Sequence, residues 1–155
     1  MSTKKPALSL PEYLPYRLAI TSNRVSRMVA RAYRARFGLS IWEWRTLAIL
    51  GEGRSITAQD LAELAAMDKV AVSRAVKSLV ERGLVERVAH AGDGRSRLLH
   101  LTLAGQDVYQ DVVPMALDAE ARLLERLSPG ERAQLAGLLE KIRVSAQDLL
   151  DQSEG

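Results

Sequence analysis

A set of basic and hydroxyl side chains between residues 69 and 78 fits the chemistry of nucleic-acid binding. The set consists of Lys69, Ser73, Arg74, Lys77 and Ser78. Basic side chains neutralise phosphates, an arginine pairs with guanine through two hydrogen bonds, and a serine hydroxyl bonds to donors or acceptors on base edges. If this segment is a helix, the opposite face carries an apolar stripe made of Val72, Val76, Leu79 and Val80. A solvent-exposed amphipathic helix without a ligand gives the same pattern, so the neighbouring elements must decide.

A second candidate group follows in the stretch "AGDGRSRLLHLT", residues 91 to 102. Its alternation of apolar and polar residues around glycines predicts a β-hairpin with Asp93, Gly94 and Arg95 at its tip. Arg95 at the tip could enter a minor groove, where narrow A·T-rich DNA concentrates negative potential. Arg97, on the returning strand, could contact backbone phosphate. The alternative is a hairpin stiffened by a pairing of Asp93 with Arg95 and without a ligand.

The elements that must position these residues are mostly helices with marked starts. "SIWE", "TAQD" and "SPGE" each place a capping Ser or Thr three residues before an acid. Apolar periodicity and glycine stops then predict helices over about 14–36, 41–50, 58–66, 69–82, 103–127 and 129–150. Two short strands, "LVERVA" and "SRLLHLT", follow Gly83 around the turn "HAGDG". The order predicts a mostly α protein with a small β-hairpin, arranged as a winged helix-turn-helix.

The run from about residue 39 to 105 resembles the MarR family of bacterial transcription regulators. The resemblance is carried by "DKVAVSRAVKSLVERGLVER" and by "DGRSRLLHLTLAG". The second segment matches the family's wing pattern, D-x-R-(five residues)-L-T-x-x-G, at Asp93, Arg95, Leu101, Thr102 and Gly105. The flanking helices match in order and length, so the resemblance extends over nearly all of the chain. In this family the wing acid looks like a residue that pairs with the arginine and holds the turn.

The resemblance implies a sequence-specific DNA-binding regulator that acts as a homodimer, typically a repressor. Residues 38–102 would form the DNA-binding lobe, while 11–37 and 103–151 would form an intertwined helical dimerisation region. The last two predicted helices carry more apolar surface than one small chain can bury, at Leu117, Leu123, Leu124, Leu127, Leu135, Leu138, Leu139, Ile142, Leu149 and Leu150. A two-fold dimer would read a palindromic operator whose half-sites lie about one helical turn apart.

A stripe of arginines along the first helix raises a separate question. Residues 13 to 42 contain six arginines and no acid, and Arg17, Arg24, Arg27, Arg31 and Arg34 fall on one helix face. This face could be simply solvated, could meet an acidic face of the partner subunit, or could bind an anionic effector such as an aromatic acid or a coenzyme A thioester. For the effector we predict contacts from Trp44, Arg24 and Arg31, because similar proteins hold their effector near the start of the second helix. Effector binding would then change the spacing of the two recognition helices.

Composition excludes several other classes of protein. There is no Cys and only two His, which rules out disulfides, thiol-based sensing and a metal site built on a His cluster. We found no nucleophile and base set, paired catalytic carboxylates or phosphate-binding glycine loop, so we expect neither an enzyme nor a cofactor. No apolar run reaches the length of a membrane span, so we expect a cytoplasmic protein.

The charge is uneven along the chain. Residues 1–102 carry 17 Lys and Arg against 9 Asp and Glu, and residues 103–155 carry 5 against 10. The first part therefore attracts polyanions. The alternatives are an architectural winged-helix DNA-binding protein without an effector, or a winged-helix module that binds another protein. Sequence-selective DNA binding would argue against both.

Overall fold

Side-chain caps set where several helices begin. Ser40 and Ser128 each accept a hydrogen bond from the backbone N–H three residues on, at Glu43 and Glu131. The two glutamate carboxylates accept a hydrogen bond in return from the N–H of the capping serine. Asp68 caps the helix that begins at Lys69 by accepting from the N–H of Ala71 at 2.8 Å. These caps satisfy N–H groups that have no partner within the helix, which is why the starts were predictable from sequence.

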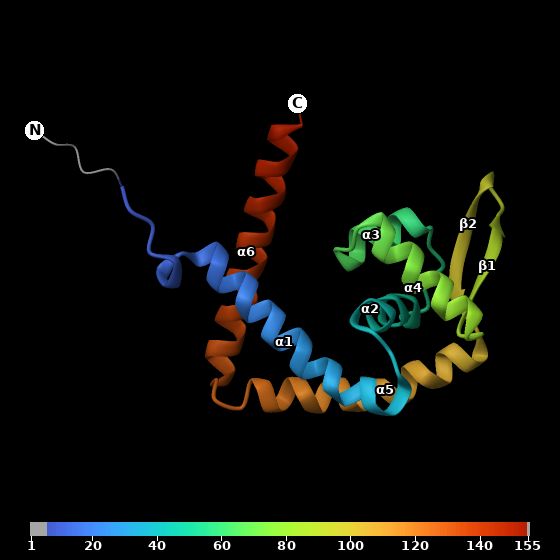
Figure 1. The fold of residues 1–155 in the computed structure, drawn as a ribbon, viewed down its shortest axis with the longest axis horizontal. Helices are drawn as coiled ribbons and strands as arrows, with labels where there is room; N and C mark the ends of the chain where they lie inside the picture. Colours follow the sequence, from blue (N-terminus) through green and yellow to red (C-terminus); the bar gives the residue numbers. More distant parts are fainter. Residues whose placement is uncertain (1–5, 155) are drawn as a thin grey trace, which may run out of the picture. The chain divides into compact units, whose positions relative to one another are not determined.

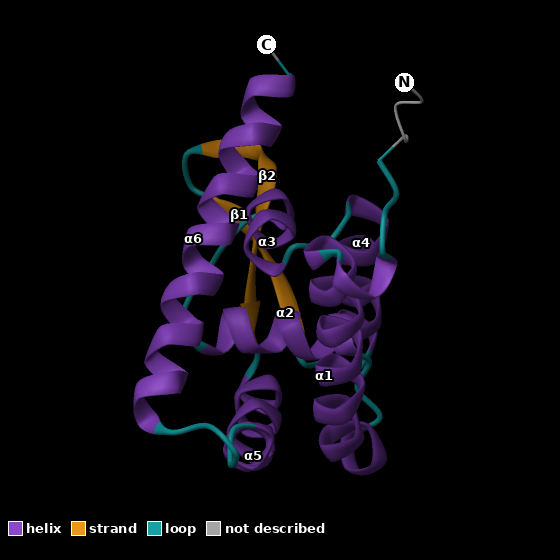
Figure 2. Cartoon of the chain, turned by 90° about the vertical axis from the view of Figure 1, so that its left-hand side faces the viewer, coloured by secondary structure: helices purple, strands orange, loops and turns teal. Residues whose placement is uncertain are grey.

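The structure is a computed structural model and describes residues 6–154, apart from the side chain of Asp93. In chain order its elements are η1 (Leu10–Glu12), α1 (Leu14–Phe37), α2 (Ile41–Gly51), α3 (Ala58–Ala65), α4 (Lys69–Glu81), β1 (Val85–His90), β2 (Asp93–Leu101), α5 (Leu103–Leu123) and α6 (Pro129–Ser153). Helices make up most of the described chain, and β1 and β2 form a hairpin directly after α4 (Figures 1 and 2). The mostly α winged helix-turn-helix is thus confirmed. No described helix is both long and apolar enough to cross a membrane.

The predicted helix ends hold at most positions, with one clear error at α5. Gly38 ends α1 in the left-handed conformation, with φ of 62°. We predicted that the next-to-last helix reaches residue 127, but α5 ends at Leu123. The guanidinium of Arg132 donates to the carbonyl oxygens of Leu124 and Leu127, at 2.8 and 3.2 Å. These contacts stabilise the turn after α5, in which the carbonyl of Leu124 also accepts from the N–H of Leu127 at 2.9 Å, and they were not visible in the sequence pattern.

The hairpin turns earlier than predicted. The register runs from Val85 opposite Leu101 to Ala89 opposite Arg97, then shifts so that His90 lies opposite Asp93, and Ala91 and Gly92 lie in the turn. The N–H of Gly92 donates to Nδ1 of His90 at 3.0 Å, which closes the turn at this point. The prediction that Asp93, Gly94 and Arg95 form the tip is therefore wrong. These three residues begin β2.

A short third segment joins the hairpin. Ile56, between α2 and α3, exchanges two backbone hydrogen bonds with Leu99 of β2, at 3.2 and 2.8 Å. Thr57 then caps α3 by accepting from the N–H of Asp60. The start of the helix-turn-helix is thereby fixed to the base of the wing.

One hydrophobic core joins the helix-turn-helix, the hairpin and parts of α1 and α5. Leu47 of α2, Leu61 of α3 and Leu79 of α4 are fully buried. They pack in one cluster with Tyr33 of α1 and Val112 of α5. Burial raises the pKa of Tyr33, although the nearby Arg34 and Arg45 guanidiniums lower it. The helix-turn-helix and the hairpin therefore rest on a shared apolar base.

The L-T-x-x-G part of the wing motif fixes the base of the hairpin to α5. The hydroxyl of Thr102 donates to the carbonyl of Gly83 at 2.6 Å and accepts from the N–H of Gly105 at 3.0 Å. A Cβ on Gly105 would clash with the carbonyl oxygen of Leu84. Glycine is therefore required for α5 to approach the start of β1 this closely.

By its internal contacts the chain divides into two compact units, with the division between Ala119 and Glu120. The first unit holds the helix-turn-helix, the hairpin, α1 and most of α5. The second holds the end of α5 and α6, and every residue of α6 is exposed. The division into a lobe of residues 38–102 and a dimerisation region of 11–37 and 103–151 stays a prediction.

Candidate nucleic-acid interface

The outer face of α4 carries four of the five polar residues singled out in the sequence. Val72, Val76 and Leu79 are buried in the core, as predicted, and this orients the opposite face of the helix outward. The four exposed side chains on that face are Lys69, Ser73, Arg74 and Lys77. Lys77 lies 4.0 Å from Glu81 in an exposed pair one helical turn apart, an arrangement that contributes little to stability. The face is free for a ligand of opposite charge.

Ser78 lies at the border of this face, and its role as a DNA contact stays a prediction. The residue is only partly exposed, and its hydroxyl donates to the carboxylate of Glu43 at 3.2 Å. The helical spacing places Ser78 at the border between the polar and apolar faces. Only the position of α2, which brings Glu43 to this border, decides that Ser78 points inward.

A hollow of about 640 Å³ joins α4 to the wing. Lys69 and Ser73 line it from α4, and Arg95 and Arg97 line it from β2. Ser96, between these two arginines, faces the same hollow. Residues that were separate candidates in the sequence thus share one surface.

The same hollow contains residues that the sequence reading missed. Arg87 lines it from β1, and Gln59 lines it from the first turn of α3. Arg87 pairs directly with Leu99 across the hairpin, and Leu99 lies two residues beyond Arg97. Because opposite residues share a face and faces alternate along a strand, the correct register would have revealed Arg87 on the same face as Arg97.

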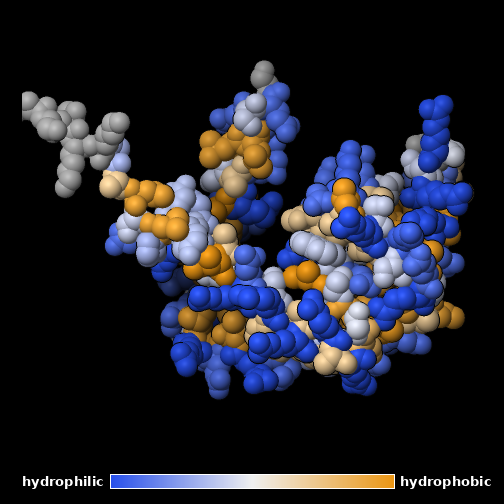
Figure 3. Space-filling view, viewed as in Figure 1, coloured by the Kyte–Doolittle hydropathy of each residue, from blue (hydrophilic) through white to orange (hydrophobic). Residues whose placement is uncertain are grey.

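The charges of this surface are largely uncompensated. Among the described residues, no carboxylate lies within ion-pair distance of Arg74, Arg87 or Arg97. Figure 3 shows hydrophilic residues over the end of the wing. The predicted pairing of Asp93 with Arg95 falls on a side chain outside the described residues. Three arginines without nearby acids give a surface suited to a polyanion.

The predicted effector residues do not come together. Arg24 and Arg31 are exposed and line a hollow of about 490 Å³ on α1, together with Arg27 and Arg34. Trp44 does not line this hollow; it is partly buried against the core, with its ring centroid 5.6 Å from that of Tyr33 and 6.2 Å from that of Tyr109. The residue joins α1, α2 and α5 by ring packing, and its role as an effector contact stays a prediction.

The other tryptophan is the exposed one. Trp42 is 40% exposed, and it lines a second hollow of about 630 Å³ beside Arg27, Arg34 and Arg45. The guanidinium carbon of Arg45 lies 5.2 Å from the centroid of the Trp42 ring. Sequence alone gave no means of deciding which tryptophan faces outward. Within the part of the chain that the structure describes, no group of three His, Asp or Glu side chains could hold a metal ion.

Comparison with known proteins gives one consistent result. The sequence profile of the MarR family matches residues 37–96. The HTH-type transcriptional repressor Rv2887 of Mycobacterium tuberculosis is 28% identical over 130 residues, which cover 84% of this chain and 91% of the repressor. These curated relatives are transcriptional regulators and not enzymes.

Solved structures agree in fold over most of the chain. A MarR family transcriptional regulator from Silicibacter pomeroyi DSS-3 is 33% identical, with a TM-score of 0.77 over 90% of this chain and 99% of that protein. CouR from Rhodococcus jostii RHA1, solved with bound p-coumaroyl-CoA, is 22% identical, with a TM-score of 0.75 over 88% of this chain and 95% of CouR. The second likeness is one of fold.

Proposed function

The chain belongs to the MarR family of transcriptional regulators, and from this premise we propose that it is a homodimeric repressor released from its operator by an anionic effector. The observation that carries the proposal is the shared surface of α4 and the wing. There Lys69, Ser73, Arg95 and Arg97 line one hollow, and each of the four is in reach of a ligand that spans it.

On DNA, we assign different tasks to α4 and to the hairpin. Arg74 and Ser73 on α4 would read base edges in the major groove, while Lys69 and Lys77 neutralise phosphates. Arg95 and Arg97 of β2, with Arg87 of β1, would follow the adjacent backbone and minor groove. Asp93, which begins β2, would support Arg95 in this position.

Dimerisation is supported by apolar residues that this chain leaves exposed. In α6 these are Leu135, Leu138, Leu139, Ile142, Val144, Leu149 and Leu150. Figure 3 shows orange surface on α6 and on the N-terminal segment, where Leu8, Leu10 and Leu14 are exposed. A soluble monomer rarely leaves so much apolar surface uncovered, and a two-fold interface would cover it. The two lobes would then bind a palindromic operator.

The effector is proposed to bind on α1. Arg24, Arg27, Arg31 and Arg34 surround one hollow, and Trp42 offers an aromatic surface in the hollow next to it. Guanidiniums bind carboxylates and phosphates through paired hydrogen bonds, and an indole stacks on an aromatic ring. This combination suits an aromatic acid or an aromatic acyl coenzyme A thioester. The p-coumaroyl-CoA bound by CouR belongs to that class.

Fluorescence anisotropy tests the proposal. The protein is titrated onto the duplex upstream of its own gene and onto a scrambled duplex, in about 150 mM salt, with a panel of aromatic acids and acyl-CoA thioesters. We expect nanomolar binding to the first duplex only, reversed by one class of compound. Equal and steeply salt-dependent binding to both duplexes would indicate an architectural DNA-binding protein and not a repressor. Selective binding that no compound reverses would contradict the proposed effector.

A further inference from the structure

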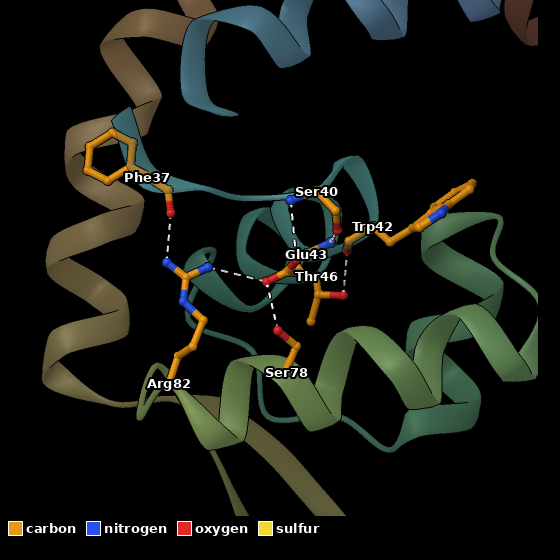
Figure 4. Close-up of polar contacts among 7 residues, drawn as sticks. All are labelled: Phe37, Ser40, Trp42, Glu43, Thr46, Ser78 and Arg82. Atoms are coloured by element: carbon orange, nitrogen blue, oxygen red, sulfur yellow. Dashed lines mark hydrogen bonds and ion pairs between the residues drawn. The ribbon is translucent and has the colours of Figure 1, made fainter. Parts of the chain in front are cut away.

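A single carboxylate, that of Glu43, connects the start of α2 to the end of α4 (Figure 4). Its Oε1 accepts from the N–H of Ser40 at 3.2 Å, which completes the helix cap. Its Oε2 accepts from the hydroxyl of Ser78 at 3.2 Å and from the guanidinium of Arg82 at 3.3 Å. The same guanidinium donates from its other terminal nitrogen to the carbonyl of Phe37 at 2.7 Å. We call Glu43, Ser78 and Arg82, with the Phe37 carbonyl, the α1–α4 clasp.

Helix capping explains only half of these contacts. The cap of α6 has the same two hydrogen bonds, between Ser128 and Glu131. Within the described part of the chain, Glu131 makes no further side-chain hydrogen bond or ion pair, whereas Glu43 uses its second oxygen for two residues of α4. The side chain of Glu43 is also only 12% exposed, so its charged hydrogen bonds are less screened by water. The contacts to α4 therefore have a role beyond capping.

The clasp lies at the short connection between α1 and α2, where a contact can fix the angle between α1 and α4. Phe37 is the last residue of α1, and its carbonyl is one of those that a helix end leaves without a helical partner. Only Gly38, Leu39 and Ser40 separate it from α2. Arg82 is the C-cap of α4, so its guanidinium fastens the end of α1 to the end of the recognition helix.

We propose that Glu43 and Arg82 are positioning residues for operator recognition. They hold the recognition helix at a fixed angle to α1, and thereby set the distance between the two recognition helices of the dimer. The inference rests on the proposed function, since it requires a dimer that reads two half-sites. Ser78 belongs to this device and not to the DNA-contacting face.

The test distinguishes a positioning role of Glu43 from a stabilising role by replacing one oxygen of its carboxylate. Glu43→Gln keeps an oxygen for the N–H of Ser40, because glutamine also serves in this cap, but it removes the acceptor for Ser78 and Arg82. Glu131→Gln is the matched control, since it makes the same change in the cap of α6. Arg82→Lys keeps the charge, but a single ammonium does not reproduce the planar fork that reaches both Glu43 and Phe37.

Three duplexes are compared for each variant. The first is a two-half-site operator that the wild-type protein selects from a random library. The second has one half-site scrambled, and the third has its half-sites moved apart by two base pairs. We expect Glu43→Gln and Arg82→Lys to bind the first duplex at least about fivefold more weakly and the second unchanged. Their preference for the first duplex over the third should shrink, while Glu131→Gln matches wild type throughout.

The outcomes distinguish a failure of the clasp proposal from a failure of the proposed function. Equal weakening on all three duplexes would show a structural role only, and wild-type behaviour of both variants would show no role; either result overturns the clasp. A wild-type protein that selects no paired half-sites overturns the proposed function and the clasp with it. If Glu43→Gln melts well below wild type, Ser78→Ala takes its place. It removes one donor, and a smaller loss confined to the first duplex is expected.

Discussion

The two regions of the first 102 residues differ in their charge balance. Residues 1–37 carry eight Lys and Arg against one acid, whereas residues 38–102 carry nine against eight. Most of the positive excess that the sequence shows thus belongs to α1 and the residues before it. The lobe proposed to bind DNA is almost neutral.

Four of the eight acids of the lobe make side-chain hydrogen bonds to neighbouring groups. Asp60 and Asp68 lie at helix starts, and Glu43 belongs to the α1–α4 clasp. Glu86 bonds to His100 at 2.6 Å. Among the described residues, no carboxylate lies within ion-pair distance of Arg74, Arg87 or Arg97. Net charge therefore does not indicate the proposed DNA site, whereas the position of a few basic side chains does. We therefore expect DNA binding by the lobe to depend on the exact position of individual side chains. Ligand binding by α1 should depend on the total positive charge of that helix.

The largest effect is expected from Gly105→Ala, which disturbs placement without changing charge. The new Cβ meets the carbonyl of Leu84, so the free energy of unfolding should fall by about 3 kcal/mol. Urea unfolding measures it. Gly137→Ala in α6 is the control, because open space surrounds that glycine and alanine favours helix. If the Gly105→Ala protein were as stable as wild type, the wing base would not be held this tightly.

Arg74→Ala should cost about 1 to 3 kcal/mol of operator affinity and relax specificity at one position in each half-site. The physical reason is the loss of a paired hydrogen bond to a base edge. Anisotropy titrations on operators with single base changes measure it, with Lys141→Ala in α6 as the control for lost charge. If all sequences weaken alike, Arg74 contacts phosphate instead.

Arg95→Ala should weaken operator binding at least about tenfold, because the wing loses its contact with the electronegative minor groove. The dimer and its melting temperature should not change, since the side chain is exposed. Titration, size-exclusion chromatography and thermal unfolding check the three statements. Unchanged operator affinity would show that Arg95 of the wing does not contribute to DNA binding.

The smallest effect on DNA is expected from the double change Arg27→Ala and Arg31→Ala. Operator affinity should stay within about twofold of wild type, as for surface changes away from the contact. The effector concentration for half-release should rise at least about tenfold. Arg17→Ala is the control, because Arg17 is on the same stripe but does not line either hollow. Unchanged release would place the effector elsewhere.

Local signals in the sequence predicted the elements well, and long-range contacts account for the errors. The caps at Ser40 and Asp68 and the stop at Gly38 depend on residues within a few positions, so they were readable. The surroundings of Ser78 and Trp44 were not predicted because each side chain is oriented by a distant partner. Ser78 bonds to Glu43, 35 residues away, and Trp44 packs on Tyr109 of α5. The missed Arg87 needed the hairpin register, in which Arg87 lies opposite Leu99, and the sequence pattern did not give that register.

The most direct test of the comparison is the salt dependence of operator binding for two double variants. One is Arg95→Ala with Arg97→Ala in the wing, and the other is Arg27→Ala with Arg31→Ala in α1. Each phosphate contact contributes about 0.9 to the slope of log K against log salt concentration. We predict that the wing variant loses a slope of about 2 if each arginine neutralises one phosphate, and that the α1 variant keeps the wild-type slope. A flatter slope for the α1 variant and an unchanged slope for the wing variant would contradict the account, because the arginine-rich helix would then be the DNA contact.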